Sequence, residues 1–96
     1  MEQTERIGYM EKILNEGTAA VAALEDALDR YTALAPRLEE LFEYYGSARW
    51  FADLEDDEAG RLPDGLCRGV LSEDAVYDLI SDCRRIEDML AGFAQL

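Results

Sequence analysis

The residues of this chain that are best suited to chemistry gather between Asp53 and Glu58, where five of six positions are carboxylates. Oxygen-rich clusters of this kind suit magnesium or calcium, and a bound magnesium ion can orient a water molecule for hydrolysis. The register does not fit a calcium loop of the EF-hand type, which requires glycine where Glu58 stands and glutamate where Asp64 stands. The candidate metal ligands are Asp53, Glu55, Asp57 and Glu58.

Two other interpretations of this acidic segment stay open beside the cation site. In one, the carboxylates form a solvated face held by arginines: Arg61 lies four residues after Asp57, and Arg68 is placed to fold back across the loop that follows. In the other, the segment is a docking patch for a protein. Charge runs are most often solvated faces, so we favour the structural interpretation.

Five of the nine aromatic residues lie directly before the acidic segment, between Phe42 and Phe51. Tryptophan and tyrosine are typical anchors of binding surfaces, but they also fill small cores. A short chain needs each of its large apolar residues for its core, so we favour the core interpretation. The residues that we single out as an interaction or structural motif are Trp50, Tyr45, Arg61, Arg68 and Asp74.

Composition excludes several classes of function. The 96 residues allow one domain, 1–96, and their 9 basic and 22 acidic side chains give a net charge of −13. That charge argues against binding to nucleic-acid phosphates or to an anionic membrane surface. The chain contains no histidine, so Ser-His-Asp and Cys-His catalysis are absent, and we lean towards a protein that is not an enzyme.

The cysteine usage and the N-terminus predict a cytoplasmic protein. Cys67 and Cys83 lack the spacing of a zinc or redox motif, and two reduced thiols are typical of the cytoplasm. The charged N-terminal residues do not resemble a signal peptide, and no segment reaches the ~20 apolar residues of a membrane helix.

The first third of the chain predicts a long helix from about residue 3 to 34. Its apolar stripe has heptad spacing, and a flanking row of Ile13, Ala20, Ala27 and Leu34 makes it wider than a two-stranded coiled coil requires. Gly17 leaves a gap in the stripe, which is suited to a bulky side chain from another helix. The stripe consists of Ile7, Met10, Leu14, Gly17, Val21, Leu24, Leu28, Tyr31 and Ala35.

Pro36 predicts a tight turn at 34–36, because proline disfavours the helical conformation of the preceding residue. A middle helix then follows, broken at Gly46-Ser47, with its second piece at 48–58. Residues 59–71 predict an ordered loop. Ser72 is expected to cap the last helix, with Leu71 and Val76 forming a hydrophobic staple. The predicted fold is all-α, an antiparallel three-helix bundle.

The segment from Tyr44 to Leu79 resembles a known family. The residues that carry the resemblance are Tyr44-Tyr45-Gly46-Ser47, Trp50, the acidic run to Glu58 with Gly60 and Leu62-Pro63, and Leu66 to Asp74 followed by Tyr77 and Leu79. They are similar to small acidic bacterial proteins classed as a domain of unknown function, number forty-two ninety-eight of that series. The resemblance implies an all-helical cytoplasmic bacterial protein and no assigned activity. Cys67 departs from it, since a polar or basic residue is expected there.

Three hypotheses about function follow. The favoured one is a helical protein-interaction or structural module of uncharacterised role, in the form of a homodimer or with another protein partner. The second is a magnesium- or calcium-dependent enzyme or metal-binding protein that uses the acidic segment. The third is an acidic decoy that binds a basic protein, which a net charge of −13 permits.

Overall fold

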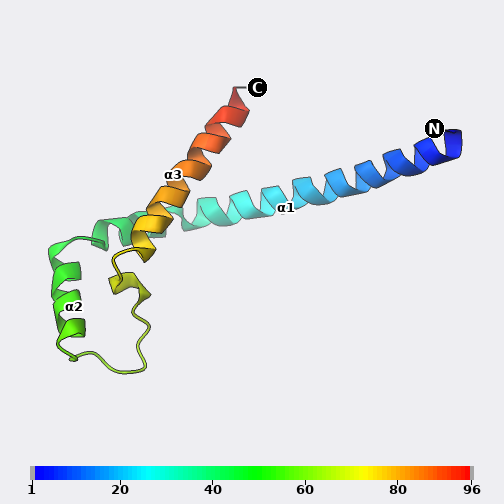
Figure 1. The fold of residues 1–96 in the computed structure, drawn as a ribbon. Helices are drawn as coiled ribbons and strands as arrows, with labels where there is room; N and C mark the ends of the chain where they lie inside the picture. The colour runs from blue at the N-terminus through cyan, green and yellow to red at the C-terminus, as the bar shows by residue number, and fades with distance from the viewer. Residues whose placement is uncertain (1, 96) are drawn as a thin grey trace. The chain divides into compact units, whose positions relative to one another are not determined.

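The computed structural model describes residues 2–95, which contain three α-helices and a single 3-10 turn (Figure 1). Helix α1 spans Gln3–Tyr44, α2 spans Ala48–Glu58, η1 spans Gly69–Leu71 and α3 spans Ala75–Ala94. The described part of the chain has no β-strand, so the all-α class and the long first helix are confirmed. The antiparallel bundle packing and the single domain stay predictions.

Pro36 lies inside α1, so the predicted turn at 34–36 is wrong. Proline removes one backbone hydrogen bond, the one that position 36 would donate to the Thr32 carbonyl, and it does not remove the others. Strong helix formers stand on both sides, with Ala33-Leu34-Ala35 before the proline and Leu38 to Leu41 after it. These residues favour the helical conformation on both sides of the proline, and the helix continues through it.

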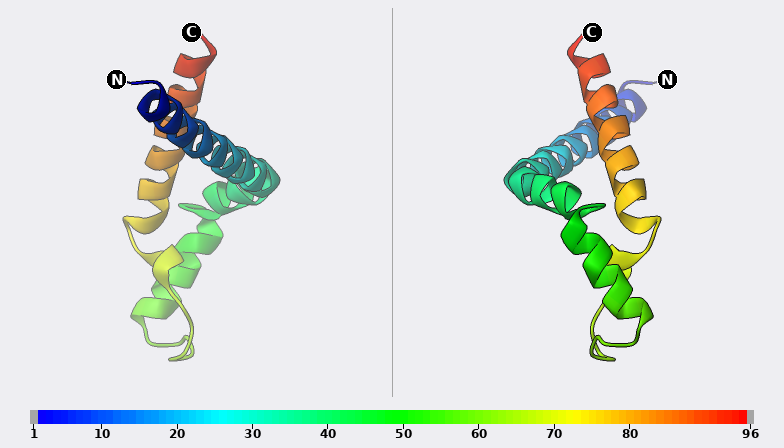
Figure 2. Two further views of the ribbon diagram at one scale, coloured as in Figure 1. Left: turned by 90° about the vertical axis from the view of Figure 1, so that its right-hand side faces the viewer. Right: turned by 90° about the vertical axis from the view of Figure 1, so that its left-hand side faces the viewer.

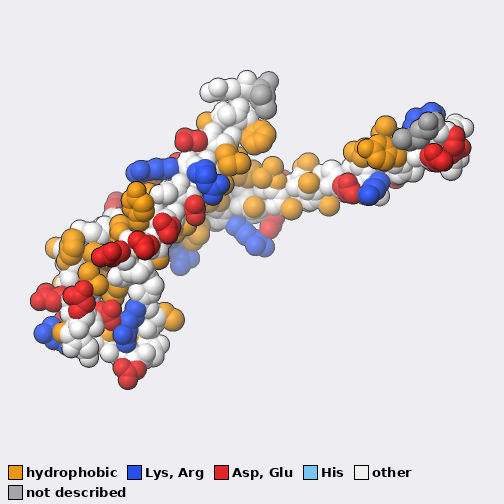
Figure 3. All heavy atoms as spheres, viewed as in Figure 1, with side chains coloured by type: hydrophobic (Ala, Val, Ile, Leu, Met, Phe, Trp, Pro, Cys, Tyr) orange, Lys and Arg blue, Asp and Glu red, His pale blue; other side chains and the backbone are white. Residues whose placement is uncertain are grey.

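Pro36 also marks the boundary between two compact units, which we describe separately. Unit 1 ends at Pro36 and consists of the N-terminal part of α1. Unit 2 begins at Arg37 and holds the end of α1, together with α2, η1 and α3. In unit 1, the apolar side chains of the heptad stripe from Ile7 to Leu28 lie at the surface, and Tyr31 and Ala35 are half-buried; Figure 3 shows apolar side chains along α1.

The predicted break at Gly46-Ser47 is confirmed, since α1 ends at Tyr44 and α2 begins at Ala48. Gly46 has a φ of 79°, a conformation that glycine adopts without strain. The Ser47 hydroxyl then joins the two helices: it donates to the Tyr44 carbonyl at 2.6 Å and accepts from the Trp50 amide at 3.2 Å. One side chain thus ends α1 and caps α2.

Helix α2 ends in a Schellman turn at Gly60, whose φ is 72°. The Gly60 amide donates to the Asp57 carbonyl at 3.0 Å, and the Arg61 amide donates to the Asp56 carbonyl at 2.9 Å. These two bonds satisfy carbonyls that the end of a helix leaves open. They also fix the direction in which the loop 61–68 leaves the helix.

The core of unit 2 consists of four buried side chains: Trp50 from α2, Leu71 from η1, and Val76 and Cys83 from α3. The short η1 contacts both α2 and α3 and so links the two helices (Figure 2). The Trp50 indole donates from Nε1 to the Val70 carbonyl at 2.9 Å. This bond ties α2 to a segment twenty residues further along the chain.

Helix α3 begins later than predicted, at Ala75 with Asp74 as its N-cap residue. The Asp74 side chain makes no capping bond, whereas the Ser72 hydroxyl accepts from the Ala75 amide at 3.2 Å. Ser72 is held in the preceding turn, because its own amide and hydroxyl both donate to the Gly69 carbonyl. It therefore supplies the capping oxygen from outside the helix.

We predict that Trp50→Phe destabilises the protein by about 1–3 kcal/mol, because it leaves the Val70 carbonyl without its indole donor. The matched control is Phe51→Leu, which changes the next aromatic side chain at a site that is 58% exposed. Urea unfolding followed by far-ultraviolet circular dichroism measures both. Equal midpoints for the two variants would contradict this role of Trp50.

Candidate interaction site

The acidic residues of α2 divide between the two sides of the helix. Asp53 and Asp57 are half-buried, and Glu55 and Glu58 are exposed. The Tyr44 hydroxyl donates to Asp53 Oδ2 at 2.6 Å, which joins the end of α1 to the middle of α2. The sequence analysis missed this bond, because the turn at Gly46 that brings the two side chains together leaves no periodic signal.

Arg68 folds back across the loop and pairs with Asp57, with 3.0 Å between Nη1 and Oδ1. Its Nη2 atom also donates to the Pro63 carbonyl at 2.8 Å. Neither Asp57 Oδ1 nor Arg68 Nε, both buried atoms, has an aligned hydrogen bond among residues 2–95, so the attraction of the pair is mainly coulombic. The loop from Pro63 to Arg68 is therefore closed onto α2, as the structural interpretation of the acidic segment predicts.

Arg61 pairs with Asp56 at 2.7 Å and not with Asp57, the partner that sequence spacing suggests. The Schellman turn explains the difference, because it leaves the helix path after Ala59 and brings Arg61 back over Asp56. A spacing of four residues predicts contact only while the helix continues. The acidic segment thus meets both arginines, with one pairing shifted by a residue.

An aromatic cluster of Tyr45, Trp50 and Phe51 lies next to the acidic segment. Trp50 makes edge-to-face contacts with Tyr45 at 5.2 Å and with Phe51 at 5.0 Å between ring centroids. The Tyr45 hydroxyl donates to the Glu73 carbonyl at 2.8 Å, beside Asp74 at the start of α3. Trp50 is buried, Tyr45 is half-buried and Phe51 is exposed, so the cluster is partly core and partly surface.

The carboxylates do not gather into a metal-binding group. Within residues 2–95, no set of three or more cysteine, aspartate or glutamate side chains is close enough to hold a metal ion. Asp53 and Asp57 have Tyr44 and Arg68 as partners, and Glu55 lies two residues from each aspartate and so faces another side of the helix. Magnesium or calcium binding stays a prediction.

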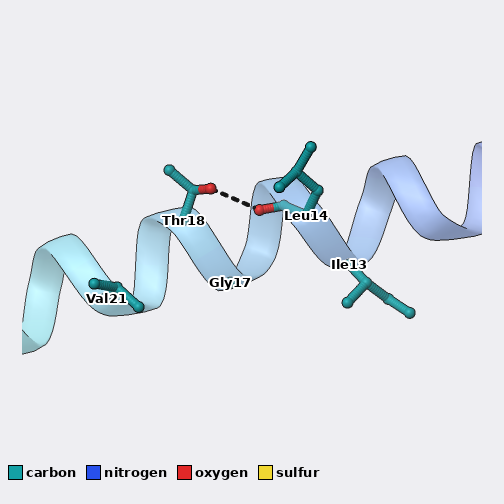
Figure 4. Close-up of a pocket in the computed structure, with 5 residues that line it drawn as sticks. All are labelled: Ile13, Leu14, Gly17, Thr18 and Val21. Carbon is teal, nitrogen blue, oxygen red and sulfur yellow. Dashed lines mark hydrogen bonds between the residues drawn. The ribbon is translucent and has the colours of Figure 1, made fainter.

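An apolar surface of unit 1 runs along α1 and consists of the stripe together with its flanking row. Eight of its large side chains are between 37% and 64% exposed: Ile7, Met10, Ile13, Leu14, Val21, Leu24, Leu28 and Leu34. Gly17 lies in a shallow apolar depression among Ile13, Leu14, Thr18 and Val21 (Figure 4). No described helix is long and apolar enough to cross a membrane.

The chain thus combines an exposed heptad stripe with a small helical unit closed by an acidic helix and two arginines. It belongs to the family described as Domain of unknown function (DUF4298), whose model matches residues 7–91. The match includes all of the stripe and all of the acidic and aromatic segment. No curated protein and no solved structure gives a significant match to the chain.

We predict that Arg68→Ala lowers the free energy of unfolding by about 1–2 kcal/mol, because Asp57 loses its partner at a half-buried position. Arg61→Ala is the matched control: it removes an arginine pair that lies more in water, and its expected effect is below about 0.5 kcal/mol. Urea denaturation gives both values. A larger effect of Arg61→Ala would show that the loop is held elsewhere.

The hydrogen bond to Asp53 raises the pKa of Tyr44 above its usual 10.0, and desolvation and the Asp53 charge act in the same direction. Since the folded state favours the protonated phenol, this stabilisation is complete below about pH 10 and is lost as the pH rises through the raised pKa. We predict that Asp53→Asn lowers the pKa of Tyr44 towards 10.0.

Ultraviolet titration of the phenolate measures this pKa, with a Tyr44→Phe variant to isolate the signal of this tyrosine. The control is Glu55→Gln, which removes an exposed carboxylate of the same helix and is expected to leave the Tyr44 titration in place. A Tyr44 pKa that Asp53→Asn leaves unchanged would refute the assigned cause.

Proposed function

We propose that this protein is a helical protein-interaction module that binds a partner helix through the apolar stripe of unit 1. The observation that carries the proposal is the exposure of that stripe. Its eight large apolar side chains follow one face of a single helix, and each is at least 37% exposed. Contiguous apolar patches of this size on a soluble surface usually mark an interaction site.

The pattern of the stripe favours a helix as the partner. Apolar residues at heptad spacing insert between the side chains of a facing helix, and a partner of another shape does not match that period. Burying eight half-exposed large side chains contributes on the order of 8 kcal/mol for one face, as an upper estimate. That gain is comparable to the free-energy cost of association, ~4–15 kcal/mol, which comes from the loss of translational and rotational freedom. Burial of the partner's own apolar face would add to the gain.

Unit 2 supports the proposal as the folded part of the module. Its buried core, its two capped turns and the ion pair between Arg68 and Asp57 all lie within the unit itself. In unit 1, none of the described residues is buried, and its ion pairs Lys12–Glu16 and Arg30–Asp26 join exposed side chains. A partner on the stripe would supply the burial that unit 1 lacks.

We expect Leu24→Asp to weaken association through the stripe at least about a hundredfold, because it places an unpaired carboxylate in the contact face. Ala23→Asp is the matched control: it adds the same charge one residue earlier, on the side of α1 that faces away from the stripe. Light scattering across a concentration series and affinity capture from a lysate of the source cells measure association for both variants.

Comparing association of the two variants tests the proposed function. Loss of association in Leu24→Asp, together with retention in Ala23→Asp, supports the module. If the wild-type chain associates with nothing, or if both variants associate as the wild type does, the proposed function is wrong. Near-ultraviolet circular dichroism, which reports the packing of the aromatic side chains in unit 2, checks that neither substitution unfolds the core.

A further inference from the structure

We propose that a cleft of unit 2, between the end of α1 and the middle of α3, binds a small zwitterion with an apolar side chain, such as a free apolar amino acid. The cleft has a volume of about 460 Å³ and is lined by Glu39, Phe42, Ile80, Cys83, Arg84 and Glu87. All six residues belong to unit 2, whereas the stripe belongs to unit 1. The inference therefore goes beyond the proposed function and does not rest on it.

Two helix faces form the walls of the cleft. Glu39 and Phe42 are three residues apart on α1, so they lie on one face of that helix. The α3 wall has the spacing i, i+3, i+4 and i+7, which also describes a single face, and consists of Ile80, Cys83, Arg84 and Glu87. Regular helical spacing on both sides shows that the cleft is built by the helices themselves and not by the loop that joins α2 to η1.

The apolar part of the cleft consists of Phe42, Ile80 and Cys83. Cys83 is buried in the core of the unit, and Phe42 and Ile80 are half-buried beside it. Small-molecule sites in proteins have volumes of about 300–1,000 Å³ and combine apolar walls with a few polar groups. The cleft has this size and this composition, and its apolar part can remove an aromatic or aliphatic ligand side chain from water.

The polar part of the cleft carries charges of both signs. The guanidinium of Arg84 suits a carboxylate, which it can bind through two parallel hydrogen bonds. The carboxylate of Glu39 suits an ammonium group. Among residues 2–95, neither side chain has an ion-pair partner. Glu87 already has an interaction within the chain, so we assign it no contact with the ligand.

Charge complementarity distinguishes a zwitterion from a simple ion. A ligand that is only anionic would face Arg84 but would also bring its charge close to Glu39, in a chain with a net charge of −13. A ligand that is only cationic would face Glu39 and place its charge beside Arg84. Like charges that meet in this way act against binding, whereas a zwitterion offers each side chain an opposite charge.

Titration of the chain with L-phenylalanine tests the proposal, with heteronuclear NMR to follow the backbone amides. Two probes of similar shape each lack one charge: phenethylamine has no carboxylate, and hydrocinnamate has no ammonium group. We expect L-phenylalanine to cause saturable shifts around Phe42 and Cys83. We expect each singly charged probe to bind at least about tenfold more weakly.

Variants of the two charged side chains assign their roles. Arg84→Gln is expected to make L-phenylalanine bind no better than phenethylamine, and Glu39→Gln no better than hydrocinnamate, because each removes the partner of one ligand charge. The matched controls are Arg85→Gln, whose arginine is exposed and pairs with Asp82 at 3.4 Å, and Glu40→Gln at an exposed position of α1. Both controls are expected to bind L-phenylalanine as the wild type does.

Several results would overturn the inference. Absence of saturable shifts in the cleft with L-phenylalanine would show that the cleft does not bind this class of ligand. Equal affinity of the wild type for L-phenylalanine and for either singly charged probe would overturn the zwitterion. An Arg85→Gln effect as large as that of Arg84→Gln would mean attraction by overall charge and not by the cleft. Far-ultraviolet circular dichroism confirms that each variant is folded, and association through the stripe, measured separately, decides the proposed function whatever the cleft binds.

Discussion

The bond between the Trp50 indole and the Val70 carbonyl is the contact on which unit 2 depends. It fixes α2 against η1, and η1 in turn holds Leu71 in the core and supplies the turn that contains Ser72. Tyr45 stacks edge-on against the same indole and reaches the Glu73 carbonyl. Two stacked aromatic side chains, Trp50 and Tyr45, therefore link α2 to η1 and to the start of α3, in a unit with few other buried residues to do so.

The acidic helix is stable because its charges have local partners. Carboxylates near a helix C-terminus are unfavourable, since the helix dipole places negative charge there. Arg61 and Arg68 offset this effect, each on a different aspartate, and Tyr44 donates to a third. The chain as a whole has an excess of negative charge, and in α2, where carboxylates are concentrated, three of them have an arginine or tyrosine partner. The other acidic side chains favour solubility.

The sequence predicted what depends on local chemistry. Heptad spacing predicted a long first helix, Gly46-Ser47 predicted the break before the helix at 48–58, and the excess of negative charge in the acidic segment predicted that Arg68 folds back towards it. It failed where neighbouring effects compete: at Pro36 the flanking helix formers prevailed over the proline. The bonds of Tyr44 and Trp50 were also missed, because they depend on turn geometry rather than on period. Periodicity revealed an apolar face and could not reveal what covers it.

Pro36 separates a helix without a core from a unit that has one. An isolated helix owes most of its stability to the surface on which it packs, so a partner helix on the proposed stripe would also stabilise residues 3–36. Under that proposal, binding would protect this helix from proteases as well, because a packed helix opens less readily than an isolated one.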